Sequence, residues 1–232
     1  MLAGIYIMST SPILAMNMMK KRSLSWFTAF LLFALFGTLG LRAQDNPYAS
    51  QVLRPPKGAK LALIVFEDLE CPDCARAAPL IEEASKAYKI PIVRYDFPLV
   101  QHLWSFDAAV MARYFSSKSP ALGVAFKEYI FARQVQINGP NPMDGEAQKR
   151  NLRGVAEQFA REHKTVLPFA VDPTGKFAAA VRADKSVGDR VGITHTPTLY
   201  VVTDRQQGTP FVEVVDRNQL YNLIDQLKAQ AQ

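Results

Sequence analysis

The only two cysteines of the 232-residue chain form the motif Cys71-Pro72-Asp73-Cys74. They stand where a short apolar run gives way to a stretch with a helical pattern. A thiol at the start of a helix faces unpaired backbone N–H groups and the positive end of the helix dipole, which favour its thiolate form. Because this spacing lets the two sulfurs bridge, the motif predicts thiol–disulfide exchange, with Cys71 as the nucleophile and Cys74 as the resolving thiol.

Two other roles for the pair remain open, a fixed structural disulfide and a metal-binding site. A disulfide that closes so short a loop removes little entropy from the unfolded chain, so it would stabilise the fold only slightly. Structural zinc takes four ligands, and the three histidines, His102, His163 and His195, are scattered. A haem attachment motif would need histidine where Ala75 stands. Redox chemistry is therefore the favoured interpretation, with no metal and no bound organic cofactor expected.

The elements around the motif are predicted by the hydrophobic pattern. The run Leu61–Phe66 (LALIVF) is continuously apolar, as in a strand buried on both faces. A helical stretch, Pro72–Tyr88, and a second strand, Ile90–Phe97, complete the opening of a βαβ unit. We expect helices next, over residues 103–117, 120–132, 145–163 and 173–187, then an antiparallel hairpin of strands 198–203 and 211–215 and a final helix, 218–229, with Asn218 as its N-cap.

This order of elements predicts an α/β fold with a four-stranded mixed sheet and a helical insertion at about residues 100–190. The composition, 49% hydrophobic and 21% charged residues, is that of a globular protein and excludes disordered, collagen-like and coiled-coil chains. There is no glycine-rich phosphate loop after either early strand and no GxSxG motif. Nucleotide binding and an α/β-hydrolase activity therefore have no support.

Residues 1–43 have the pattern of a secretory signal. The basic cluster Lys20-Lys21-Arg22 precedes the apolar run 24–41, and the sequence Arg-Ala-Gln-Asp follows it. Because the run has 18 residues and the large Leu41 stands at position −3 of the cleavage site, an uncleaved membrane anchor through residues 24–41 is the alternative. In both cases the folded part is expected in the periplasm or another extracytoplasmic space.

The charge and the boundaries of the folded part follow from this assignment. Residues 1–43 hold four of the 27 basic residues and none of the 21 acidic ones, which leaves 23 against 21 and no basic excess for a nucleic-acid partner. Residues 44–60 are a polar lead-in segment, for which we expect a short edge strand at Gln51–Arg54. The domain itself is predicted over residues 61–232.

The stretch LIVFEDLECPDCARAAP resembles the active-site segment of the thioredoxin superfamily, and the helical block resembles its DsbA-like branch of exported disulfide oxidoreductases. Pro79 stands where the first helix of this family is kinked by a proline. Ile193–Thr198 (ITHTPT) is similar to the loop that holds the family's cis-proline, and Tyr95–Leu99 with His102 is similar to its exit from the second strand. The resemblance covers about residues 61–229.

The resemblance implies a thioredoxin-like fold and thiol:disulfide oxidoreductase activity through both cysteines. It implies a cis peptide bond before Pro197, which leaves the backbone of Thr196 available to an extended substrate segment. Pro72 and Asp73, between the cysteines, would modulate the pair. The clients would be cysteine-containing exported proteins, and a separate membrane partner would reoxidise or reduce the pair. A reductase or isomerase is the nearest alternative, and a metal-delivery module is an alternative of another class.

The sequence departs from the family pattern in its acidic residues. Relatives often carry a buried acid six positions before the first cysteine, where Val65 stands here. Glu67 has the same strand parity and is a candidate to replace that acid, but we expect it to be a solvated or capping carboxylate. Four acids lie within seven positions around the nucleophile: Glu67, Asp68, Glu70 and Asp73. Because nearby negative charge disfavours a thiolate, they are predicted to raise the pKa of Cys71 and to make the couple less oxidising than in relatives with a histidine between the cysteines.

The histidines and aromatic residues receive lesser roles. His195, beside the expected cis-proline, is a candidate to lie near the sulfurs and offset the acids, and a bystander role in its loop is the alternative. His102 is expected to start a helix or to pack, and His163 is assigned no function. Five aromatic residues of the helical block are expected to form its core rather than a client groove: Tyr114, Phe115, Phe126, Tyr129 and Phe131.

Overall fold

The computed structural model describes residues 46–141, 143–205 and 210–230. The expected signal or anchor, residues 1–43, lies outside the described residues. No helix within these three ranges combines the length and the apolar character that a membrane span requires.

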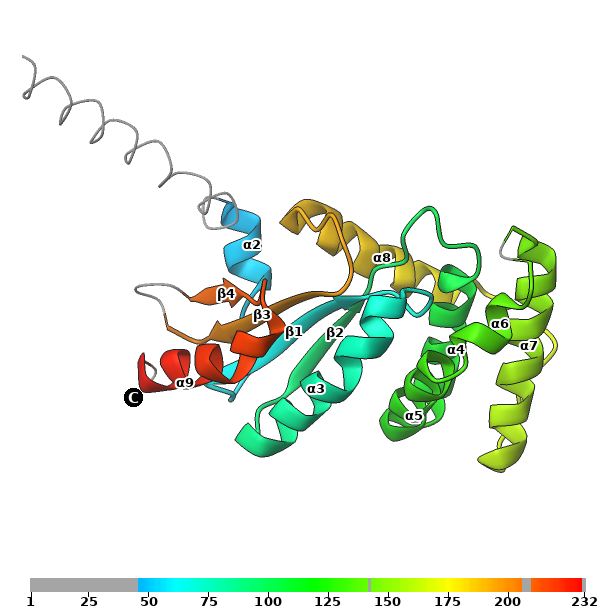
Figure 1. Cartoon of the computed structure of the whole chain (residues 1–232), viewed down its shortest axis with the longest axis horizontal. Coiled ribbons are helices and arrows are strands. Elements are labelled where there is room, and N and C mark those ends of the chain that lie inside the picture. Colours follow the sequence, from blue (N-terminus) through cyan, green and yellow to red (C-terminus); the bar gives the residue numbers. More distant parts are fainter. Residues whose placement is uncertain (1–45, 142, 206–209, 231–232) are drawn as a thin grey trace, which may run out of the picture. The chain divides into compact units, whose positions relative to one another are not determined.

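In the described part of the chain four strands form one mixed sheet, in the order β2-β1-β3-β4 (Figure 1). They are β1 (Leu61–Glu67), β2 (Ile92–Asp96), β3 (Thr198–Thr203) and β4 (Phe211–Glu213). Strand β1 runs parallel to β2 and antiparallel to β3, which is antiparallel to β4. All seven residues of β1 are buried, as its apolar sequence predicts for a central strand covered on both faces. The predicted α/β fold with a four-stranded mixed sheet is confirmed.

One face of the sheet is covered by α3 (Pro72–Tyr88) and α9 (Leu220–Gln230). Their apolar side chains pack on those of β1 and β3, and the stripe of Leu220, Ile224 and Leu227 on α9 is buried, as its helical spacing predicts. A proline, Pro79, lies inside α3 at the position that the resemblance implies. This packing fixes the start of α3 against the end of β1, where the CxxC motif lies.

Helix α8 (Lys176–Val191) packs against β2 and the residues that follow it. At Gly188 a Cβ atom would lie 2.4 Å from the ring of Phe97, so the close approach of this helix requires glycine. The short helix α2 (Pro47–Val52) packs on α8, and the side-chain amide of Asn46 donates to the carbonyl of Arg190 at 2.8 Å. The segment before the predicted domain is thus attached to it.

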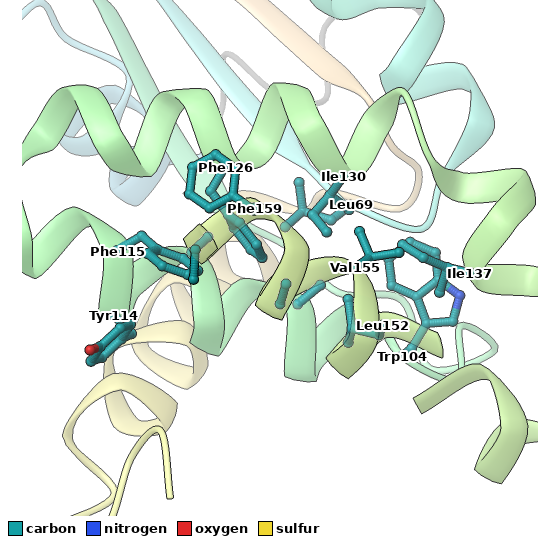
Figure 2. Close-up of a cluster of buried hydrophobic side chains, with 14 residues drawn as sticks. Leu69, Trp104, Tyr114, Phe115, Phe126, Ile130, Ile137, Leu152, Val155 and Phe159 are labelled. Atoms are coloured by element: carbon teal, nitrogen blue, oxygen red, sulfur yellow. The ribbon is translucent and has the colours of Figure 1, made fainter. Parts of the chain in front are cut away.

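Among the described residues between β2 and α8, four helices form the helical lobe: α4 (Ser105–Lys118), α5 (Pro120–Phe131), α6 (Gln134–Asn138) and α7 (Gly145–Glu162). Figure 1 shows them together at one end of the sheet. The centre of the helical lobe is a group of three buried rings, Phe115, Phe126 and Phe159, with centroids 4.6 to 5.1 Å apart (Figure 2). The predicted core role of the aromatic residues is confirmed, with Tyr129 and Phe131 packed at its margin.

Two local predictions were wrong, one in the lead-in segment and one at the last helix. Residues 51–54 do not form an edge strand, because α2 extends to Val52 and is capped by Asn46, whose side chain accepts from the N–H groups of Tyr48 and Ala49. Asn218 is not the cap of the last helix, because a 3₁₀ turn, Arg217–Gln219, precedes it. The side chain of Asp216 caps that turn and accepts from the N–H of Asn218 at 3.0 Å.

Candidate active site

The two cysteines lie where the sequence predicts, at the start of α3. Cys71 is the N-cap residue and Pro72 the first helical residue, where a missing N–H removes no helical hydrogen bond. Cys74 follows one turn later and accepts a hydrogen bond from the N–H of Asp68 at 3.4 Å. Both are free thiols, 7% and 2% exposed, so Cys71 lies closer to the surface and Cys74 beneath it.

The two thiols differ sharply in acidity. The pKa of Cys71 is lowered to about 5, chiefly because the Cys74 thiol donates a hydrogen bond to its sulfur. The Thr196 side chain and the backbone N–H groups of Cys74 and Asp73 lower this pKa further, whereas burial acts in the opposite direction. Burial and the neighbouring Cys71 raise the pKa of Cys74. The pair therefore consists of a thiolate nucleophile and a neutral partner that donates to it.

The acidity of Cys71 predicts a separation of the two thiols by alkylation. In the reduced protein, Cys71 should react with iodoacetamide with a midpoint near pH 5, whereas Cys74 should remain unmodified until the protein unfolds. The folded pKa of Cys71 lies below that of an unfolded thiol, about 8.5. Its thiolate therefore stabilises the reduced fold fully above about pH 8.5, and this contribution is lost as the pH falls toward 5. Mass spectrometry of peptides alkylated across this range would refute the assignment if Cys74 reacted first.

The prediction that nearby acids raise the pKa of Cys71 is wrong, and the reason is that each acid has its own partners. Asp73 binds Arg217 at 2.7 Å and Arg76 at 3.0 Å through one carboxylate oxygen. Asp68 accepts from Nδ1 of His102 at 2.7 Å, and hydrogen bonding to this carboxylate raises the pKa of the imidazole. These contacts compensate the negative charge on two sides of the motif.

Glu70 is engaged in a third way, as a cap at the start of α4. Its carboxylate accepts from the N–H groups of Trp104 and Ser105, at 2.7 and 3.0 Å. Burial nevertheless raises its pKa above the ordinary range. Glu70 thus connects the loop before the cysteines to the start of the helical lobe.

The expectation that Glu67 is solvated or capping is wrong. Its side chain is 3% exposed and contacts two cations, Arg94 of β2 and Lys127 of α5, the latter at 2.9 Å. Burial alone would raise the pKa of Glu67, but Lys127 and Arg94 outweigh it and hold the pKa below the ordinary value. Lys127 also binds Asp96 at 2.7 Å. We call Glu67, Arg94, Asp96 and Lys127 the buried charge cluster, and its Glu67 is close enough to Cys74 to raise the pKa of that thiol.

The loop before β3 reaches the nucleophile from the other side. The Thr196–Pro197 peptide bond is cis, as the resemblance implies, and the sulfur of Cys71 lies 3.2 Å from the carbonyl oxygen of Thr196, to which its protonated form donates. The imidazole of His195 is 64% exposed and lies 3.9 Å from the carboxylate of Glu213. His195 lines a small cavity of about 240 Å³ with Pro197 and Asp73, at the margin of the site.

Three residues of this region were not identified from the sequence as part of the site. His102 was interpreted as a packing residue, although the motif around it was noted; its partner, Asp68, precedes it by 34 residues. Arg217 stands 144 residues after its partner, Asp73. Gln134, in α6, is buried, and its amide donates to the carbonyls of Leu69 and Cys71 at 2.8 and 3.0 Å. For His102 the signal was its place in the motif after the second strand, whereas no sequence pattern relates Arg217 or Gln134 to the cysteines.

Gln134 should contribute measurably to stability, because its amide satisfies two buried carbonyls. Gln134→Leu keeps a similar volume and leaves those carbonyls without this donor, so we expect a loss of about 1–3 kcal/mol in the free energy of unfolding. Urea denaturation of the reduced protein measures it. Gln158→Leu on α7, which removes an exposed hydrogen bond to Glu162, is the matched control and should cost about 0.5 kcal/mol or less. Equal losses in the two variants would contradict this role.

Among the described residues, no group of three or more histidine, cysteine, aspartate or glutamate side chains is arranged to hold a metal ion. The chemistry available at the site is that of the two thiols. A thiolate of low pKa close to the surface, a neutral thiol beneath it and a backbone carbonyl beside it suit dithiol–disulfide exchange.

Comparison with known proteins places this arrangement in context. Residues 56–223 match a sequence family described as Thioredoxin. A search of curated proteins finds no match. The fold is similar to BcfH of Salmonella enterica Typhimurium, with a TM-score of 0.61 at 15% identity over 93% of each chain. It is also similar to alpha-DsbA1 of Wolbachia pipientis (TM-score 0.55, 18% identity, 77% of this chain and 90% of that one) and to a periplasmic thioredoxin-like protein of Salmonella enterica serovar Typhimurium (0.56, 18%, 75% and 88%).

Proposed function

The chain belongs to the thioredoxin family, and from this membership we propose that it is an exported thiol:disulfide oxidoreductase that donates disulfide bonds to cysteine-containing proteins outside the cytoplasm. The observation that carries the proposal is the pairing of Cys71, with a pKa lowered to about 5, and the buried neutral Cys74 one turn away. A couple whose reduced form contains a stabilised thiolate is oxidising.

The proposed reaction begins with the oxidised pair. A client thiolate attacks the sulfur of Cys71, which forms a mixed disulfide and releases Cys74, and Cys74 takes up a proton because burial raises its pKa. A second client thiolate then attacks the client sulfur of the mixed disulfide and expels Cys71 as a thiolate. The client loses two electrons and gains a disulfide, and the enzyme pair gains them. The lowered pKa of Cys71 makes it the better leaving group in the second step.

The substrate is proposed to lie along the loop of Thr196 and Pro197. Because the carbonyl of Thr196 is 3.2 Å from the Cys71 sulfur, a client segment whose cysteine reaches Cys71 must pass beside this backbone. An extended segment can pair with the main chain there, whatever its side chains. Five other residues would tune the reactivity of the pair rather than bind the client. They are Pro72 and Asp73 on α3, Glu67 at the end of β1, Glu70 in the loop that follows, and His195 at the cavity margin.

The location of the reaction is proposed from the N-terminal sequence, and its redox partner from the number of cysteines. Residues 1–43 would direct export, with 24–41 either removed with the signal or retained as an anchor. A membrane redox protein would reoxidise the pair, because the chain has no third cysteine to relay electrons. The similarity to a periplasmic thioredoxin-like protein supports an extracytoplasmic location. A reductase would use the same pair in the opposite direction, with a supply of electrons, and an isomerase would start from the reduced pair and return it reduced.

The test is an equilibrium between residues 44–232 and graded glutathione buffers, with free thiols counted by mass after alkylation. We expect a potential nearer to the roughly −120 mV of strong disulfide donors than to the roughly −270 mV of thioredoxin-like reductants. A potential near that of the thioredoxin-like reductants would mean that the pair reduces disulfides instead of donating them. A pair that never cycles in this range would exclude the oxidoreductase and leave a fixed bridge or a metal-binding module, which copper or zinc titration followed by mass spectrometry would then identify.

A further inference from the structure

Arg217 makes a contact that connects the C-terminal part of the domain to the active-site motif. It begins the 3₁₀ turn between β4 and α9, yet its guanidinium reaches the residue between the two cysteines. One terminal nitrogen donates to the carboxylate of Asp73 at 2.7 Å, and the other lies 3.4 Å from the backbone carbonyl of the same residue. Arg217 therefore holds both the side chain and the main chain of Asp73.

This contact has little value for stability. Both side chains are 37% exposed, and ion pairs in such surroundings contribute little to the free energy of folding. The contact instead fixes the position of Asp73, whose backbone N–H is one of the groups that lower the pKa of Cys71. A carboxylate free to turn toward the sulfur would act in the opposite sense and disfavour the thiolate.

We propose that Arg217 is a positioning residue for the redox pair, which acts through Asp73 by holding its carboxylate on the guanidinium and its backbone N–H on the Cys71 sulfur. The proposal deepens the proposed function and rests on it, because it assigns the reactivity of the nucleophile in part to a residue of the β4–α9 connection. Arg76, on α3, binds the same carboxylate oxygen but is 67% exposed and lacks the contact to the backbone. Its role is correspondingly smaller.

Other charged and titratable groups surround the pair, and they are unchanged in the variants that test the proposal. They are Glu67 on β1, Asp68 and Glu70 in the loop that follows, Arg76 on α3, His102 after β2, His195 before β3 and Glu213 on β4. A comparison in which only residues 73 and 217 differ therefore isolates their coupling from the field of the rest of the site.

The experiment is a double-mutant cycle of Arg217→Gln and Asp73→Asn in the reduced protein. The pKa of Cys71 is measured from the ultraviolet absorbance of its thiolate across a pH titration. We expect Arg217→Gln to raise this pKa by about 0.5–1 unit, which means about 3- to 10-fold less thiolate at a pH below it. In the Asp73→Asn background, the same substitution should have less than half of that effect, because the carboxylate that Arg217 positions is then gone.

Two further variants complete the test. Arg76→Gln is the matched control and should shift the pKa by less than Arg217→Gln. Arg217→Lys keeps the charge without the two-pronged contact and should give an intermediate value, which also provides a result if the glutamine variant does not fold. An unchanged pKa in Arg217→Gln would overturn the proposal. An equal shift in both backgrounds would also overturn it, since Arg217 would then act directly as a cation.

Failure of the proposed function would be visible separately. The thiolate titration needs neither a client nor a redox partner, so it reports on Arg217 even if the pair does not cycle in glutathione. Conversely, a pair that cycles with the same potential and the same pKa in all four proteins of the cycle would leave the oxidoreductase intact and remove the role of Arg217.

Discussion

Cys74→Ser is expected to abolish disulfide donation and to accumulate a covalent adduct between Cys71 and clients that already contain a disulfide. The variant cannot form the Cys71–Cys74 disulfide that the enzyme donates. Its Cys71 thiolate, which lies closer to the surface, can still attack a client disulfide and expel the other client thiolate, and a serine hydroxyl cannot then displace the client from Cys71. The fold should tolerate the change, since the oxygen of serine can accept the hydrogen bond that the Asp68 N–H gives to Cys74. Oxidative refolding of a reduced client should fall to the uncatalysed rate, and non-reducing gels of an exported protein fraction should show the adducts.

Cys71→Ser is the control for this experiment. It should lose catalysis to the same extent but should form no adducts, because the remaining thiol, Cys74, is 2% exposed and its pKa is raised by burial. Adducts that form equally in both variants would contradict the assignment of Cys71 as the attacking residue. Wild-type rates of oxidative refolding in Cys74→Ser would contradict the need for the Cys71–Cys74 disulfide.

Lys127→Met is expected to be the most destabilising of the substitutions considered, at about 3–5 kcal/mol in the free energy of unfolding. Lys127 binds Glu67 and Asp96, and these two carboxylates are 3% and 2% exposed. The substitution fills the same space but leaves two buried negative charges with less compensation. Thermal or urea unfolding near neutral pH measures the loss.

The pH dependence of this loss separates charge from packing. Lys127 is a main cause that keeps the pKa values of Glu67 and Asp96 low despite their burial, so the variant should have raised values for both. The stability deficit should then shrink as the pH falls toward 4 and the carboxylates become neutral. Lys118→Met, at an exposed position of α4, is the control and should cost about 0.5 kcal/mol or less at every pH. A deficit independent of pH would refute the charge argument.

The sequence predicted those parts of the structure that local patterns determine. The apolar run of β1, the helix that begins at Pro72 and the placement of the cysteines between them were all correct, because strand burial and a helix start depend on adjacent residues. The cis bond at Pro197 was predicted only through the resemblance, since Thr-Pro alone does not distinguish cis from trans.

What the sequence did not reveal were the partners of the charged residues. Glu67 was interpreted as solvated because a glutamate at a strand end is usually exposed. Its two cations lie 27 and 60 residues later, on β2 and α5, and only the fold brings them together. The same holds for Asp73 and Arg217, and this is why counting acids near Cys71 gave the wrong direction for its pKa.

The contacts of the helical lobe have a consequence for how this domain could have been assembled, and for how it could be taken apart. Lys127 of α5 neutralises carboxylates of the sheet, and Gln134 of α6 holds the carbonyl of Cys71. Excising the insertion to obtain a minimal domain would therefore leave the buried carboxylates without the Lys127 cation and remove the hydrogen bond that holds the active-site loop. Chimeras that graft an insertion from one relative onto the sheet of another should fail unless residues 67, 96, 127 and 134 are exchanged as one unit.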